Sequence, residues 1–122
     1  MSVVLDKQFL FCRCLAQWIM EVHRRGYVCT IAEAGVQERR KSRMGIPFRD
    51  AVHMKNSLHY RRMAADMNLF VPDGGGMRWV TQGDDPAWTE MGEFWESLDA
   101  LCTWGGRFGD ANHLSITHGG RK

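Results

Sequence analysis

The chain has 122 residues with a formal charge of +2, and 44% of its residues are hydrophobic while 25% are charged. This length suits one domain, and the composition excludes a disordered or fibrous protein. The small net charge argues against nucleic acid as a partner, and no apolar run reaches the roughly 20 residues that stable membrane insertion requires.

The first predicted element is a helix over residues 5–25. Apolar residues recur there at helical spacing, which predicts one buried face. The residues expected on that face are Phe9, Cys12, Ala16, Ile19 and Val22 or Met20. Basic residues and then Gly26 follow, as is typical of a helix C-terminus. Residues 27–31 indicate a short strand.

The middle of the chain predicts a hairpin. A polar, basic stretch at residues 37–44 is typical of a short helix with a solvated face. Residues 63–71 indicate a buried strand, and the side chains expected on its inner face are Ala65, Met67, Leu69 and Val71. A glycine-rich turn over residues 72–76 and a returning strand over 77–81 complete the hairpin.

A second helix is predicted to begin at Asp85 and Pro86, a capping carboxylate followed by a first-turn proline. We expect it to reach about Cys102 and to end at the glycines after Trp104. Its expected inward residues are Trp88, Met91, Trp95, Leu98 and Leu101 or Cys102, and Trp79 is also expected in the core. With a final strand over 113–117, the pattern predicts an α+β fold: one domain over residues 1–122, with a largely antiparallel sheet packed against helices.

The four cysteines are interpreted as small buried apolar residues. They are Cys12, Cys14, Cys29 and Cys102, and none forms a C-x-x-C pair. Neither a cysteine zinc site nor a disulfide is therefore expected. Residues 1–20 lack the order of a secretory signal, so we expect synthesis in a cytoplasm.

Two segments carry residues with metal-binding chemistry. His59 and Asp66 are seven residues apart, which is about 10 Å on one helix and about 23 Å on one extended strand. They converge only if the chain turns between them and Asp66 starts the strand. Asp110 and His113 follow several glycines, so we expect them on a loop that enters the last strand.

Two histidines and one carboxylate suffice for a catalytic zinc, because the fourth position is left to water. A further carboxylate nearby can accept that water's proton. The residues alone leave a simpler interpretation open. Asp66 can be a strand-entry carboxylate that bonds to the backbone, and Asp110 can be a turn residue.

Both segments resemble motifs of zinc peptidases that cut peptidoglycan peptides, namely the D-alanyl-D-alanine carboxypeptidases and the phage L-alanyl-D-glutamate endopeptidases. The S-x-H-x-x-G-x-A-x-D signature is matched by Ser57, His59, Ala64 and Asp66. The W-G-G-x-F…D-x-x-H motif is matched by Trp104, Gly105, Gly106, Phe108, Asp110 and His113. The resemblance covers about residues 27–116, and the two motifs stand in the correct order.

The resemblance implies a fold of the DD-peptidase and hedgehog type. It also implies zinc (Zn²⁺) bound by His59, Asp66 and His113, with Asp110 as the catalytic carboxylate. The chain departs from the pattern at Arg62, which stands where the signature has glycine, and at Val36, where the family has an arginine. Arg39 or Arg40 would have to replace that cation, and the acidic residue of the family's H-x-E ending is replaced by Ser115.

The expected function is therefore that of a phage endolysin-like zinc endopeptidase that hydrolyses the L-alanyl-D-glutamate bond of peptidoglycan peptide stems and lyses the host. We expect a monomer that is made in the host cytoplasm and acts in the periplasm or cell wall after holin-dependent release. Two alternatives remain: a D-alanyl-D-alanine carboxypeptidase of the same fold, and a non-catalytic peptidoglycan-binding protein.

Overall fold

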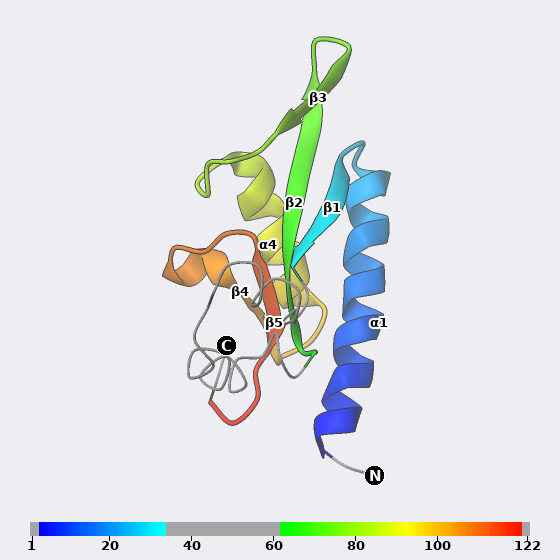
Figure 1. Cartoon of the computed structure of the whole chain (residues 1–122), viewed down its shortest axis with the longest axis vertical. Coiled ribbons are helices and arrows are strands. Elements are labelled where there is room, and N and C mark those ends of the chain that lie inside the picture. The colour runs from blue at the N-terminus through cyan, green and yellow to red at the C-terminus, as the bar shows by residue number, and fades with distance from the viewer. Residues whose placement is uncertain (1–2, 34–61, 121–122) are drawn as a thin grey trace, which may run out of the picture.

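The computed structural model describes residues 3–33 and 62–120, and all statements below concern these ranges. The elements, in chain order, are α1 (Val3–Arg24), β1 (Val28–Glu33), β2 (Ala64–Asp73), β3 (Gly76–Trp79), α4 (Pro86–Ser97), β4 (Cys102–Trp104), the 3-10 helix η1 (Gly105–Phe108) and β5 (His113–Ile116) (Figure 1). Within them, two α-helices accompany a five-stranded antiparallel sheet, which confirms the expected α+β class. The helix predicted at residues 37–44 lies outside the described residues.

Strand β2 organises the sheet. Its first residues pair with β5, its last residues pair with β3, and β1 runs along its other edge. The strands β3 and β5 therefore follow one another along the same edge of β2. The β2–β3 turn places Gly74 at φ 57° and Gly75 at φ 89°, a left-handed pair that suits a two-residue hairpin.

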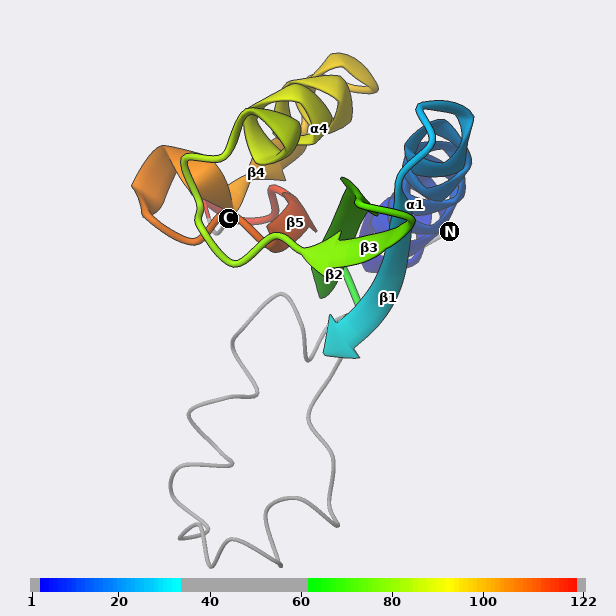
Figure 2. The same cartoon turned by 90° about the horizontal axis from the view of Figure 1, so that it is seen from above.

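The hydrophobic core lies between the sheet and the two helices, which cover the same side of the sheet (Figure 2). The inner face of β2 is confirmed, since its predicted residues are buried: Ala65, Met67, Leu69 and Val71. Trp88, Met91 and Trp95 of α4 pack into the same core, also as predicted. Each such side chain contributes about 1.5–3 kcal/mol by leaving water. The other side of the sheet is called the polar side below because it carries Asp66 and Asn68, and it also bears Phe70 of β2.

The buried face of α1 matches the prediction only at Val22 and, partly buried, at Ile19. Its buried residues are Phe11, Cys14, Trp18 and Val22. Phe9 and Met20 are 55% and 71% exposed, and Cys12 and Ala16 are exposed as well. The reason is Trp18, the largest side chain of the helix. Its ring stacks on Trp88 at 6.1 Å, and its Nε1 donates a hydrogen bond to the Met91 carbonyl oxygen at 2.9 Å.

The burial predicted for the four cysteines is wrong for Cys12. Cys14 and Cys102 are buried and Cys29 is partly buried, whereas Cys12 is exposed. The change of helix face accounts for this, because Cys12 and Cys14 lie two residues apart and cannot share one face of a helix.

Helix α4 begins as predicted but ends earlier. Its N-cap Asp85 accepts a hydrogen bond from the Ala87 N–H at 2.9 Å, yet the helix ends at Ser97 and not near Cys102. The Asp99 carboxylate accepts from the Leu101 N–H at 2.9 Å, which closes a turn instead of a further helical turn. Cys102 thus begins strand β4.

Trp79 is not a core residue, contrary to the prediction, since it is 55% exposed. It pairs with Phe70 across the β2–β3 ladder. Directly paired residues share a face, so Trp79 lies on the polar side of the sheet, opposite the helices.

An ionic network joins α1 to α4. The Glu21 carboxylate accepts hydrogen bonds from Arg24 and Arg25, and Arg25 also pairs with Glu90 at 2.7 Å. The Tyr27 hydroxyl donates to Glu90 at 3.0 Å. The two guanidinium groups lower the pKa of Glu21 to about 2.

None of the helices in the described ranges combines the length and apolar character needed to cross a bilayer.

Candidate metal centre

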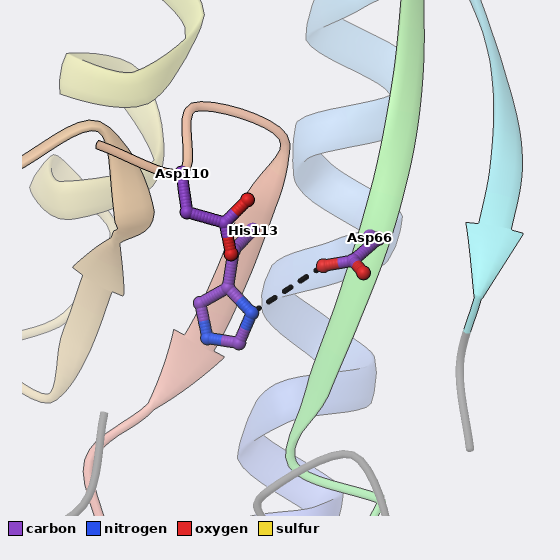
Figure 3. Close-up of side chains that lie close together, drawn as sticks. All are labelled: Asp66, Asp110 and His113. Carbon is purple, nitrogen blue, oxygen red and sulfur yellow. Dashed lines mark ion pairs between the residues drawn. The ribbon is translucent and has the colours of Figure 1, made fainter. Parts of the chain in front are cut away.

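Asp66 and His113 form a cross-strand pair. Asp66 is the third residue of β2 and lies directly opposite His113, the first residue of β5. Side chains of directly opposed residues point to the same face, here the polar one. The His113 Nδ1 atom is 3.4 Å from Asp66 Oδ1, as Figure 3 shows. Sheet register alone therefore brings two potential ligands together, and Asp66 lies near the start of its strand as predicted.

The loop that enters β5 places Asp110 beside this pair. The loop begins where η1 ends at Gly109, whose φ of 84° is left-handed. The Asp110 N–H donates to the Gly105 carbonyl at 2.8 Å, and the His113 N–H donates to the Asp110 carbonyl at 3.1 Å. These bonds hold Asp110 beside the cross-strand pair, with its carboxylate directed toward the space between Asp66 and His113 (Figure 3).

The two glycines of the W-G-G motif have a steric role. A Cβ atom on Gly105 would lie 2.1 Å from the Asp110 carbonyl oxygen and 2.7 Å from the His113 Cβ. A Cβ on Gly106 would lie 2.2 Å from the Trp104 ring. Only glycine therefore allows the start of the loop to pass this close to its end.

Trp104 supports the same loop from the core side. Its Nε1 donates to the Ala111 carbonyl at 2.6 Å, and the side chain is buried. The Arg107 guanidinium lies 5.2 Å from the Trp104 ring and pairs with Glu96 of α4 at 2.7 Å. Trp104 therefore packs beside the site loop.

The three side chains differ in exposure. His113 is 7% exposed, Asp66 is partly buried and Asp110 is exposed. The Phe108 ring lies beside the imidazole at a tilt of 59°, with the ring centres 6.0 Å apart. The two strand residues are thus held in a sheltered place, while the loop residue faces outward.

The geometry suits a shared divalent cation. One ligand atom from each of Asp66, Asp110 and His113 lies within 4.8 Å of the other two. Two atoms that each lie about 2.1 Å from a tetrahedral Zn²⁺ are about 3.4 Å apart. The 3.4 Å between His113 and Asp66 equals this spacing and exceeds the roughly 2.7–2.9 Å of a direct charge-assisted hydrogen bond. Imidazole with carboxylates is a donor set for metals such as zinc.

The structure thus brings together Asp66, Asp110 and His113, three of the four site residues that the sequence predicts. The fourth, His59, lies outside the described residues, as do Val36, Arg39 and Arg40. At the place of the signature glycine, Arg62 has a φ of 62°. This is a left-handed conformation, which glycine adopts without strain and a residue with a side chain does not.

The sequence analysis missed a cleft of about 280 Å³ next to Asp110. It lies between the loop before β5 and the segment that follows β3, and Trp79 and Asn68 contribute to its wall. A signal was present in the sequence. The two-residue turn fixes the hairpin register, and the register places Trp79 on the face of Asp66.

No protein-family model matches this sequence, and a search of curated proteins finds no significant match.

Proposed function

We propose that this protein is a zinc endopeptidase that hydrolyses the L-alanyl-D-glutamate bond of peptidoglycan peptide stems. The observation that carries the proposal is the meeting of Asp66, Asp110 and His113, residues from two separate motifs, within 4.8 Å. Both motifs resemble those of one peptidase family, and their converging donors can hold a metal ion. A chance similarity in either motif would not by itself bring these donors together.

In this proposal Asp66 and His113 hold the zinc together with His59. A bound zinc ion would polarise the scissile carbonyl and lower the pKa of a coordinated water toward about 7. The sheet supplies the rigidity that such a site needs, because the two described ligands form one directly opposed pair of the β2–β5 ladder.

Asp110 acts as the general base and acid in this proposal. Its carboxylate oxygens take the proton of the attacking water and return it to the leaving amine nitrogen. Two features favour this assignment over a role as third ligand. Asp110 is exposed, whereas both strand residues are at least partly buried, and it borders the cleft. A group that exchanges protons with a substrate has to be reachable by it.

The proposed setting is that of a phage endolysin, released through a holin and acting as a monomer on the wall. The test is digestion of purified peptidoglycan by the zinc-loaded chain, with mass spectrometry of the products. We expect fragments with a new D-glutamate amino terminus and loss of activity on chelation. Removal of terminal D-alanine alone would establish the carboxypeptidase instead. Wall binding without any product would establish a non-catalytic protein.

The variant Asp110→Asn separates the roles within the site. We expect it to lose activity by a factor on the order of 10³ while it keeps its zinc, since general acid–base catalysis contributes about 10²–10⁴-fold. Asp73→Asn is the matched control, because Asp73 is an exposed aspartate at the far end of β2. Loss of zinc from Asp110→Asn would show that Asp110 is a ligand and not the base.

A further inference from the structure

The cleft beside Asp110 opens where β5 and β3 separate along the edge of β2. On one side the Met67 N–H donates to the Asn112 carbonyl at 2.9 Å. On the other side the Val80 N–H donates to the Leu69 carbonyl at 2.8 Å. The cleft therefore opens at Asn68, the residue between these two bonds, on the polar face that also carries Asp66.

The cleft has one aromatic wall and polar walls that include the Asp110 carboxylate. Its principal lining residues are Asn68, Trp79, Thr81, Gly83, Asp110 and Asn112. Among the described residues, no lysine, arginine or histidine lines it. The buried Trp88 also contributes to the lining, and its Nε1 donates to the Val80 carbonyl at 3.3 Å.

Two of these residues present complementary surfaces. Trp79 is 55% exposed, so a large part of its side chain is accessible. Asn68 is oriented by a hydrogen bond from its Nδ2 to Thr30 Oγ1 at 3.2 Å. Its amide keeps a second N–H and a carbonyl oxygen for further bonds. A flat aromatic surface beside carboxamides matches a sugar ring that bears an acetamido group, which has an apolar C–H face and amide and hydroxyl edges.

Charge disfavours the other half of the substrate within the cleft itself. The D-glutamate side of the scissile amide carries carboxylates, and Asp110 is the only charged side chain among the described residues that line the cleft. The acyl side is different, because the sugar and its lactyl-alanyl arm are uncharged. The cleft thus suits the part of the stem that precedes the scissile bond.

We propose that this cleft binds the N-acetylated amino sugar to which the peptide stem is attached, with the Trp79 indole packed on the sugar ring. The proposal rests on the proposed function, since it places the sugar on the acyl side of the bond that is cut. It makes Trp79 a specificity residue that distinguishes sugar-linked stems from free peptides.

The first test is binding, which needs no hydrolysis. The probe is the uncharged amide of N-acetylmuramyl-L-alanine, titrated calorimetrically into the full chain. We expect Trp79→Ala to weaken binding about tenfold, which corresponds to about 1.4 kcal/mol. Trp79→Phe should retain most of the affinity because it keeps a flat ring. Met77→Ala is the matched control, since Met77 is 44% exposed on the same strand and face but does not line the cleft.

The second test compares the hydrolysis of a sugar-linked stem with that of the same stem peptide without sugar. We expect Trp79→Ala to raise KM for the sugar-linked stem about tenfold and to change the KM of the free peptide by a much smaller factor. Equal binding of the probe by wild type and Trp79→Ala, or an equal KM change for both substrates, would overturn the proposal. If neither substrate is hydrolysed while the probe still binds through Trp79, the proposed function fails and the sugar site stands.

Discussion

The two ends of strand β2 differ in burial and in the elements that pair with them. At its start, Ala64 and Ala65 are buried, and Asp66 faces His113 across the ladder with β5. At its end the strand continues into a hairpin in which all four residues of β3 are exposed. One end of β2 thus borders the packed group of Asp66, Asp110 and His113, and the other end leads into an exposed hairpin. The packed end therefore fixes the positions of the candidate metal ligands, while the exposed end leaves side chains such as Trp79 accessible.

Of the proposed substitutions, Gly105→Ala should have the largest effect on stability, because Gly105 packs against the loop that holds Asp110. The added Cβ would lie 2.1 Å from a backbone oxygen of Asp110, so the loop has to move. We expect a loss of about 3 kcal/mol of unfolding free energy, at the upper end of typical overpacking costs. We also expect a strong loss of metal affinity. Chemical denaturation and metal titration measure the two effects.

Gly76→Ala is the matched change in the hairpin. A Cβ there would meet only the Asp73 carbonyl oxygen, at an ordinary 3.9 Å. Stability should stay within about 0.5 kcal/mol. Equal destabilisation by the two alanines would contradict the contrast between the ends of β2.

Trp104→Phe tests the support of the site loop with a smaller change. The variant loses the 2.6 Å hydrogen bond to the Ala111 carbonyl and leaves a small void in the core. We expect a loss of about 2 kcal/mol in thermal or urea unfolding. The control Trp79→Phe, at an exposed position, should change stability by less than about 0.5 kcal/mol. If both variants behave alike, Trp104 does not support the loop.

Arg62→Gly should stabilise the protein. Arg62 has a φ of 62°, and a left-handed conformation costs a residue with a side chain about 1–2 kcal/mol. Glycine relieves that strain but has more freedom in the unfolded chain, which leaves a net gain of about 1 kcal/mol. A melting temperature equal to or below that of wild type would show that the arginine is not strained.

The smallest expected effect concerns pH and the α1–α4 network, far from the site. Arg24 and Arg25 lower the pKa of Glu21 from 4.5 to about 2, so the ionised form is favoured in the folded state. The stabilisation of the folded state by the ionised Glu21 is fully present above pH 4.5 and is lost as the pH falls toward 2. Glu21→Gln should therefore flatten the decline of stability in this acid range. An unchanged acid slope in urea titrations would remove Glu21 as a cause.

Local patterns in the sequence predicted most of the fold. The β2 alternation, the Gly74–Gly75 hairpin and the Asp85 cap depend on neighbouring residues and were confirmed. The end of α4 was missed because the Asp99 turn competes with the helix through a side-chain hydrogen bond that helical periodicity does not reveal.

The buried face of α1 depends on tertiary contacts, whereas the face of Trp79 follows from the hairpin register. Two apolar stripes of α1 fit the same helical period, and the choice between them came from the contact of Trp18 with α4. For the site, the motifs predicted which residues meet, and the register of β2 against β5 supplied the distance between Asp66 and His113. The cleft could not be predicted from any single segment, because it depends on how β3 and β5 follow one another along one edge of β2.

The central claim is that Asp66 and His113 share one divalent cation, and zinc titration by calorimetry tests it most directly. We predict one Zn²⁺ per wild-type chain, with Asp66→Asn and His113→Asn each weakening binding by at least about 100-fold. Asp73→Asn should bind as wild type does. Circular dichroism checks that the variants are folded. Zinc affinity unchanged in both site variants, or no zinc binding by the wild-type chain, would contradict the claim.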